Sequence, residues 1–587
     1  MPCWGARCSS AAWPGTYVPL GPVGPPLSPL PPRPAAPDHA LSRATWDTGR
    51  MADRDRLSGD AAPWWSGATF YQVYVRSWQD SNGDGTGDLQ GIYERLDYLG
   101  SLGIDGIWLS PTMPSPNTDW GYDVSDYKGV HPDLGTHEDL SRLVKEARNR
   151  GISVLLDLVP NHTSSAHPWF VEARSGPGAE YRDWYVWAPP KEGNAPPNNW
   201  ISATGAPAWT YDETSGQYYL HNFLPTQPDL NWWNPAVHSE FESVLRYWWD
   251  RGVAGFRIDV AHGLYKDDQL RDDPPATDAD PPQTRRGNLS PIYSEHRPEV
   301  HQVYRAWRNI ADSYEPGRVL LGETWEFDHK RLGDYYGREA PELHLCFNFP
   351  FVFSGFSAKE IAKVVESSLA GLPAGATPTW TASNHDVGRF PTRWCGGDNR
   401  AVKAALLVMA TLPGTMVLYY GDELGMTDVD VPPELQIDEM SLAQPGHPGR
   451  DRGRTPMPWT GEKNAGFTVP SARPWLPLGD HSSLNVQAEE ADPQSVLNFW
   501  RRLGRLRRSR KIGAPSQLET LLLDDQCWVY RAGGVVTVAN LSPEAARVLL
   551  PRQIGKVLVS SSPEKEAGDA GQRLSLGPWE VLVADEA

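Results

Sequence analysis

Acidic, basic and histidine side chains follow several short apolar runs of the β type, and their spacing suggests chemistry. Arg257 and Asp259 lie two residues apart in the run 255-GFRIDV-260, so both side chains point to the same face of a strand. A guanidinium beside a carboxylate favours the ionised form, and a carboxylate nucleophile must be ionised. These two residues therefore predict a nucleophile with its own counter-charge.

Glu323 supplies a second carboxyl group. It ends the next predicted strand beside the apolar residues Leu320, Leu321 and Trp325, and apolar surroundings favour the protonated form at neutral pH. One ionised and one protonated carboxyl group on adjacent strands is the arrangement that glycoside hydrolysis requires. A separation of about 5–5.5 Å would give retention of configuration through a covalent glycosyl-enzyme intermediate.

Further polar residues follow other predicted strands. Asp157, Asn161 and His162 come at the end of one strand, and His385 and Asp386 after another. Taken singly, an Asp at a strand end is more often a helix cap or an acceptor for a loop hydrogen bond. Taken together, these residues would place many charged side chains at one end of one fold. Burying charge is costly, so a purely structural role does not explain the group.

The elements that would position these residues alternate between β-rich runs and helices such as 141–150 and 239–251. This alternation predicts an α/β fold of the (β/α)8 TIM-barrel type. In such a barrel the active site lies at the carboxyl ends of the strands. The eight predicted strands are 69–75, 106–110, 153–158, 255–259, 319–323, 343–349, 379–384 and 416–420.

The rest of the chain divides into further regions. Residues 64–160 and 235–512 form the predicted barrel, interrupted at 161–234 by a small inserted domain rich in Trp, Pro, Asn and Gly. Alternating strands at 513–587 predict a C-terminal β-sandwich. Residues 1–50 carry eleven prolines in the first 37 positions, and we expect them to be disordered and to precede the true start of translation. A genuine Pro-rich tail is the alternative.

Composition limits the classes of partner. The formal net charge of −19 argues against a nucleic-acid or anionic-membrane partner, and no apolar run approaches the roughly 18 residues of a membrane span. The five cysteines are scattered, with neither metal-site spacing nor an evident disulfide framework, which favours a reducing compartment. We expect a cytoplasmic monomer.

Four ordered segments resemble the conserved regions of the α-amylase superfamily (glycoside hydrolase family 13). They are 157-DLVPNH-162, 255-GFRIDV-260, 322-GETW-325 and 384-NHD-386. The resemblance implies that Asp259 is the nucleophile, Glu323 the general acid/base and Asp386 the transition-state stabiliser. It also implies a group of residues that hold the sugar in the first subsite, namely His162, Arg257 and His385.

The segment 227-QPDLNW-232 is similar to the α-glucosidase and oligo-1,6-glucosidase branch of that superfamily. In this branch an Asp–Arg pair closes the non-reducing end of the pocket, which implies exo-acting release of terminal glucose from short oligosaccharides. The matching positions are Asp123 and Arg454, and Tyr122 would stack on the first glucose. Pro458 stands where the family has Gln.

A second motif, 80-DSNGDGTGD-88, has the pattern of a metal-binding loop. Asp80, Asn82, Asp84 and Asp88 carry oxygen ligands at alternating positions with glycines between them, and the main-chain carbonyl of Thr86 could be a fifth ligand. Hard oxygen ligands on a tight loop favour Ca²⁺, and less well Mg²⁺. An ordinary polar turn is the alternative. The resemblance implies that the ion is structural.

The preferred linkage and the balance of reactions stay open at this point. In the resembling branch a Val after the nucleophile accompanies α-1,6 cleavage, and Ala or Thr accompanies α-1,4 cleavage, so Val260 favours α-1,6 tolerance, although it could equally be barrel packing. Transglycosylation or disaccharide isomerisation (maltose to trehalose, sucrose to isomaltulose) would use the same triad. A catalytically dead transporter ectodomain would need a membrane helix and broken catalytic positions, and the sequence has neither.

Overall fold

The computed structural model describes residues 62–443 and 449–586. The extension predicted to be disordered, residues 1–50, lies outside these residues. Within the described part, no helix is long and apolar enough to cross a membrane.

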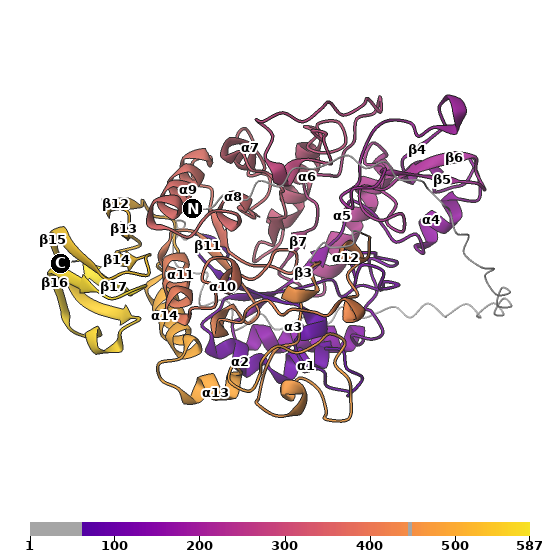
Figure 1. The fold of residues 1–587 in the computed structure, drawn as a ribbon. Helices are drawn as coiled ribbons and strands as arrows, with labels where there is room; N and C mark the ends of the chain where they lie inside the picture. The colour runs from indigo at the N-terminus through magenta and orange to yellow at the C-terminus, as the bar shows by residue number, and fades with distance from the viewer. Residues whose placement is uncertain (1–61, 444–448, 587) are drawn as a thin grey trace, which may run out of the picture. The chain divides into compact units, whose positions relative to one another are not determined.

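Eight parallel strands form a near-closed barrel (Figure 1). Their hydrogen-bonded order is β10-β11-β1-β2-β3-β7-β8-β9, so strands that follow each other around the barrel also follow each other along the chain. The predicted barrel is confirmed, with each strand at or near its predicted position. The strands are β1 (Thr69–Val73), β2 (Gly106–Leu109), β3 (Ser153–Leu158), β7 (Gly255–Ile258), β8 (Val319–Gly322), β9 (Leu345–Cys346), β10 (Thr379–Thr381) and β11 (Thr415–Tyr419).

Amphipathic helices connect and cover these strands. In α3, a capping box between Thr136 and Asp139 starts the helix, and the buried positions recur on one face, as the helical period requires. The helices of the barrel are α1 (Leu89–Glu94), α2 (Leu96–Ser101), α3 (His137–Asn149), α5 (Pro235–Trp249), α6 (Val300–Asp312), α7 (His329–Asp334), α8 (Phe349–Val352), α9 (Ala358–Gly371), α10 (Phe390–Arg393), α11 (Asn399–Thr411), α12 (Glu439–Ala443), α13 (Val486–Ala491) and α14 (Val496–Arg510).

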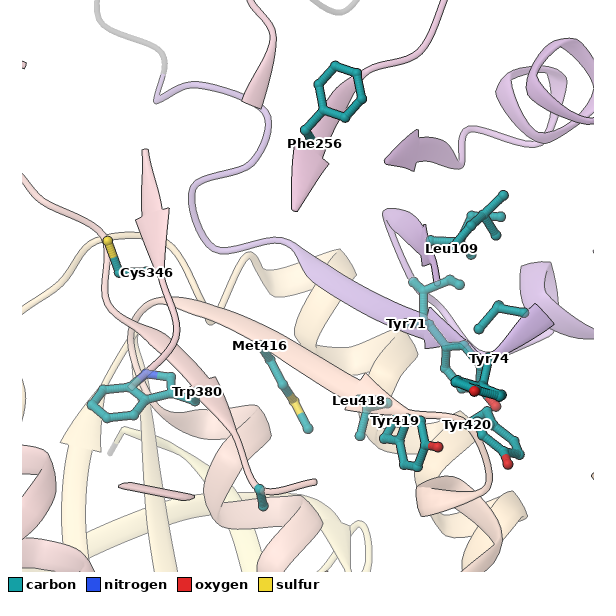
Figure 2. Packing of buried hydrophobic residues seen from close by; sticks show 14 of the residues in the cluster. Tyr71, Tyr74, Leu109, Phe256, Cys346, Trp380, Met416, Leu418, Tyr419 and Tyr420 are labelled. Carbon is teal, nitrogen blue, oxygen red and sulfur yellow. The ribbon is translucent and has the colours of Figure 1, made fainter. Parts of the chain in front are cut away.

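Alternate residues of several strands divide between two cores. On β11, Met416 and Leu418 belong to the large cluster that Figure 2 shows in part. Val417, between them, packs in the second cluster with Phe70 and Trp108. This period of two fixes which side chains of a strand face the barrel interior, and hence which polar residues at the strand ends can meet.

Long excursions leave the barrel between β3 and α5, between β7 and α6, and between β11 and α14. The first, predicted at 161–234, contains α4 (Pro168–Ala173) and a three-stranded sheet in the order β4-β6-β5, with β4 (Trp187–Ala188), β5 (Trp209–Asp212) and β6 (Gln217–Leu220). The second runs from the end of β7 to the start of α6 at Val300 and has only a short 3-10 turn at Pro282–Thr284. No sequence pattern predicted this second excursion.

The C-terminal region is an antiparallel sheet of six strands in the order β12-β13-β14-β17-β15-β16. A sandwich of two sheets was expected, whereas the strands join into one sheet with register shifts along β15. Tyr530 on β13 contacts Thr411 of α11, with 2.6 Å between the two hydroxyl oxygens. The strands are β12 (Glu519–Leu523), β13 (Cys527–Ala532), β14 (Val535–Asn540), β15 (Ala546–Ser560), β16 (Asp569–Leu576) and β17 (Val581–Glu586).

Candidate active site

Arg257, on β7, lies at the centre of the candidate site. Its Nη1 lies 2.8 Å from Asp157 Oδ1 and 2.7 Å from Asp259 Oδ1, and its Nη2 lies 2.7 Å from Glu323 Oε2. Strand register explains this meeting, because Asp157 on β3 is directly opposite Arg257, while Asp259 and Glu323 come directly after β7 and β8. All four residues are buried. The structure thus brings together three carboxyl groups from three strand ends.

The three carboxyl groups share one guanidinium charge, so ionising all of them is unfavourable. Burial raises the pKa of Asp157 to about 6, although Arg257 acts in the opposite direction. Burial also raises the pKa of Asp259 well above its usual range, and the nearby Glu323 and Asp157 carboxyl groups add to the effect. The predicted ion pair of Arg257 and Asp259 is present. The Arg257 guanidinium lowers the pKa of Asp259, but burial has the larger effect.

Glu323 does not have the apolar surroundings that were predicted. Besides its contact with Arg257, its Oε2 accepts a hydrogen bond of 3.0 Å from the main-chain N–H of Val260. Val260 presents that N–H from a left-handed conformation with φ of 44°, which is unusual for a β-branched residue. Leu320 and Leu321 pack in the two hydrophobic clusters instead. The prediction is wrong because it considered only neighbours in sequence, whereas the Glu323 carboxylate meets Arg257 from the adjacent strand β7.

Asp386 has three cationic or polarisable partners. Its Oδ1 lies 3.0 Å from Arg454 Nη2 and 3.2 Å from Arg450 Nη1, and its Oδ2 lies 3.1 Å from His385 Nε2. Burial alone would raise the pKa of Asp386, but His385 and the two arginines outweigh burial and hold that pKa well below its usual range. Asp386 is therefore ionised at neutral pH.

Two aromatic rings stack on each other beside these acids. The rings of Tyr122 and His385 stack with centroids 5.1 Å apart and an interplanar angle of 2°, and the Tyr122 hydroxyl donates to Asp157 Oδ2 at 3.0 Å. His162 Nε2 lies 3.0 Å from the main-chain oxygen of Tyr122. Burial lowers the pKa of His385 well below its usual range, although Asp386 acts in the opposite direction. The structure brings Tyr122, His162 and His385 together next to the carboxyl groups, as the sequence predicted.

Asp123 does not pair with Arg454. Its Oδ1 accepts hydrogen bonds from the Ser115 hydroxyl at 2.5 Å and the Asp119 N–H at 3.1 Å, and its Oδ2 accepts one from the Thr118 N–H at 3.0 Å. The residue is fully buried. Asp123 therefore holds the loop that precedes it, and the predicted pocket-closing role of this residue is wrong.

Arg454, too, has a structural role. Its Nε donates to the main-chain oxygen of His385 at 2.8 Å, and its guanidinium lies over the ring of Tyr74 at 5.4 Å. The hydroxyls of Tyr419 and Tyr420 donate to main-chain oxygens on either side of Arg454. Figure 2 shows these three tyrosines at the ends of β1 and β11. Arg454 thus supports the turn that carries His385.

The ion pair expected of those two residues forms instead between Asp119 and Arg450. Arg450 Nη2 lies 2.7 Å from Asp119 Oδ1 and 2.7 Å from Asp438 Oδ1, and Gln227 Nε2 donates to Asp119 Oδ2 at 3.1 Å. Because Arg450 also contacts Asp386, this pair borders the carboxyl cluster. Sequence reasoning missed Asp119, Arg450 and Asp438, which no period or strand end marks, and it used Gln227 only as part of the segment 227-QPDLNW-232.

The loop after β1 has the geometry of a nested turn. Asp80 Oδ1 accepts the N–H of Asn82 at 3.0 Å, Asn82 Oδ1 accepts that of Asp84 at 2.9 Å, and Asp84 Oδ1 accepts that of Thr86 at 2.8 Å. Asp88 caps α1 by accepting the N–H three residues on. Successive oxygens at positions 80, 82 and 84 therefore face one turn, and this carboxylate and amide donor set fits a hard cation.

With this geometry in place, comparison with known proteins identifies the family. The model of the alpha amylase catalytic domain matches residues 72–514, and that of a domain of unknown function (DUF3459) matches 515–583. The chain belongs to the α-amylase family of glycoside hydrolases. A probable alpha-glucosidase of Rhizobium meliloti is 39% identical over 510 residues, covering 83% of this chain and 91% of its own length.

Other members of the family are similar over most of the chain. An oligo-1,6-glucosidase of Parageobacillus thermoglucosidasius is 34% identical over 89% of this chain and 98% of its own length. Among solved structures, an alpha-glucosyl transfer enzyme has a TM-score of 0.83 at 36% identity, covering 90% of this chain and 100% of that one. A trehalulose synthase of Pseudomonas mesoacidophila has a TM-score of 0.81 at 31% identity, covering 89% and 100%.

Proposed function

We propose that the protein is an exo-acting, retaining α-glucosidase that removes terminal α-linked glucose from short oligosaccharides. The observation that supports this most is the contact of one guanidinium, that of Arg257, with both Asp259 and Glu323. Two carboxyl groups bound to one guanidinium lie close together, as the separation of about 5–5.5 Å in a retaining pair requires. An inverting pair needs about 6.5–9.5 Å to admit a water molecule between them.

In the proposed reaction Asp259 attacks the anomeric carbon and forms the glycosyl ester. Glu323 donates a proton to the leaving oxygen, and in the second half of the reaction it takes a proton from the attacking water. Asp386, ionised by its partners, stabilises the positive charge that develops on the sugar ring.

The first subsite would use the groups around this pair. Glucose would stack against Tyr122, while His162, Arg257 and His385 would hold its hydroxyls. The Asp119–Arg450 ion pair would close the non-reducing end of the pocket, and a closed end admits one terminal glucose rather than an internal stretch of chain.

The linkage would be α-1,4, α-1,6 or both, because relatives of this chain bear the names of alpha-glucosidases and oligo-1,6-glucosidases. Transglycosylation or disaccharide isomerisation is the second candidate. It is supported by the likeness to a trehalulose synthase, and it needs no change in the triad, since the outcome depends on whether water or a sugar hydroxyl reaches the intermediate.

We also propose a structural Ca²⁺, with Mg²⁺ as the less favoured ion, in the loop of Asp80, Asn82, Asp84, Thr86 and Asp88. The loop supports this, because it carries carboxylate and amide oxygens, the ligands that such a cation prefers, close together in sequence. The ion would stabilise the connection between β1 and α1 and take no part in the chemistry.

We also propose that the enzyme is a monomer and that it is cytoplasmic; the cysteines support the second point. Cys346, Cys395 and Cys527, the three within the described residues, are buried free thiols, which a reducing compartment favours.

The test is glucose release from maltose, isomaltose, sucrose and trehalose by the purified protein, with products separated by chromatography. Glucose as the main product from maltose or isomaltose is the expected result. New disaccharides as the main products would instead support the transglycosylase or isomerase, and no turnover of any of the four would contradict the α-glucosidase.

A further inference from the structure

The second excursion from the barrel, between β7 and α6, brings a carboxylate and an imidazole back to the end of β7. Its residues Glu295 and His296 meet His262, which follows Asp259 by three positions. The main-chain N–H of His296 donates to the oxygen of His262 at 2.9 Å, which fixes the return of the loop. We call these three residues the histidine cluster. They lie beside the carboxyl groups that contact Arg257, but their side chains touch none of those groups.

The side chains of the histidine cluster converge on one point. One ring nitrogen of each histidine and one oxygen of Glu295 lie within 4.8 Å of one another. His262 Nε2 is 3.6 Å from Glu295 Oε2, and the two imidazole rings stack with centroids 4.8 Å apart. Both His262 Nε2 and His296 Nδ1 are buried atoms with no hydrogen-bond partner in the described part of the chain. Such orphaned atoms in a native fold call for an explanation.

The charges at the histidine cluster leave one ligand atom of each residue available. Arg286 donates through Nε and Nη2 to Glu295 Oε1, at 3.1 and 2.8 Å, which leaves Oε2 facing His262. The second oxygen of Glu295 and one ring nitrogen of each histidine therefore remain as ligand atoms that lie within 4.8 Å of one another.

The surroundings of His262 Nδ1 fit a ligand histidine. This atom lies 3.4 Å from the main-chain oxygen of Glu323 and 3.3 Å from the N–H of Trp325. When Nε2 binds a metal, Nδ1 carries the proton and donates to that carbonyl, and a backbone carbonyl is a common second partner of metal-bound imidazole. Without a metal, the ring accepts the Trp325 N–H instead. Both states therefore have a hydrogen-bond partner at Nδ1.

We propose that His262, Glu295 and His296 form a binding site for a first-row transition-metal dication, with Zn²⁺ as the best match. Two imidazoles and a carboxylate are a common ligand set of Zn²⁺ with an open fourth position. Ligand atoms about 2.0–2.2 Å from a tetrahedral Zn²⁺ lie roughly 3.3 Å apart, so the pair at 3.6 Å needs little movement. Glu326 Oε2, 3.8 Å from His296 Nδ1, or a water molecule would complete the site. The side chain of His296 is 18% exposed, which gives the ion a path of entry.

The experiment is calorimetric titration of the chelator-treated full chain with ZnSO₄, in excess Ca²⁺ to fill the loop after β1. We expect one Zn²⁺ per chain, and binding that is weaker by about tenfold or more in both His296→Gln and Glu295→Gln. The matched control is His301→Gln, because His301 pairs with Glu342 at 2.7 Å without a second histidine, and this variant should bind as the unchanged protein does. Absence of Zn²⁺ binding to the unchanged protein, or binding that survives either cluster substitution, would overturn the proposal.

A measurement on the unchanged protein covers the case in which a variant does not fold. A crystal soaked in ZnSO₄ should show an anomalous peak at the zinc edge between the three side chains. A crystal whose anomalous peaks all lie elsewhere, or that shows none, would equally overturn the proposal.

Discussion

Substitution of Asp119 or Asp123, two acids of one loop, gives the clearest test. The sequence resemblance assigns the ion pair with an arginine to Asp123, whereas the structure assigns it to Asp119. In the structure Asp119 forms the ion pair with Arg450 at 2.7 Å, and Asp123 holds the loop through three hydrogen bonds. Asp119→Asn removes the charge while keeping the shape. We expect this change to impair catalysis, and Asp123→Asn to impair stability.

The magnitudes follow from the contacts. At an effective dielectric constant near 20, the Asp119–Arg450 attraction at 2.7 Å is about 6 kcal/mol, but desolvation offsets most of it. A charged hydrogen bond contributes about 1.5–3 kcal/mol net, which predicts a fall in kcat/KM of roughly 10–150-fold. In Asp123→Asn the new side-chain NH₂ faces one of the groups that donate to Asp123. This unpaired contact lowers the free energy of unfolding by about 1–3 kcal/mol.

The assay pairs kcat/KM for maltose with thermal unfolding of both variants. Asp119→Asn should lose activity with little change in Tm, because Arg450 keeps its contacts with Asp386 and Asp438. Asp123→Asn should lower Tm more than it lowers kcat/KM. Normal activity in Asp119→Asn together with a large loss in a still folded Asp123→Asn would refute the structural assignment and restore the one drawn from sequence.

Four further substitutions test the nucleophile, the buried carboxyl groups, the metal loop and the linkage preference. Asp259→Asn should lower turnover by about 10⁴-fold or more with an unchanged Tm, and appreciable residual glucose release would remove Asp259 from its role. Asp157→Asn should become more stable relative to the unchanged protein as pH rises from 4 to 6 in denaturant titrations, because the raised pKa of about 6 makes ionised Asp157 costly in the folded state; a constant difference would contradict this. Ca²⁺ at about 100 times its Kd should stabilise the unchanged protein by about 2.7 kcal/mol but not Asp84→Asn, and equal Tm shifts would exclude the loop as the site. Val260→Ala should lower the isomaltose-to-maltose ratio of kcat/KM by up to about tenfold, and an unchanged ratio would leave Val260 as barrel packing.

The parts of this protein that sequence predicts well are those set by periodicity. Strand β3 was predicted at its observed bounds because a short β-type apolar run is followed closely by Pro160 and Asn161, which favour a turn. Since parallel strands of a barrel end at one face, the strand pattern alone predicts that Asp157, Arg257, Asp259 and Glu323 lie together. The ion pairs of Arg257 with all three acids confirm this.

The parts that sequence missed lie on loops or depend on neighbours far along the chain. Asp119 and Asp123 are four residues apart, as are Arg450 and Arg454. Loop residues follow no regular period, so the sequence does not show which acid pairs with which arginine. The surroundings of Glu323 were misjudged for a related reason. Its neighbours in sequence are apolar, but its carboxylate meets Arg257 from the adjacent strand, a contact that only the barrel geometry determines.

The most direct test of the central claim is the anomeric form of the first glucose released from maltose by the unchanged protein, followed by ¹H NMR before mutarotation. The pairing of Asp259 and Glu323 on one guanidinium predicts α-glucose as the initial product. β-Glucose as the initial product would contradict a retaining mechanism and the nucleophilic role of Asp259.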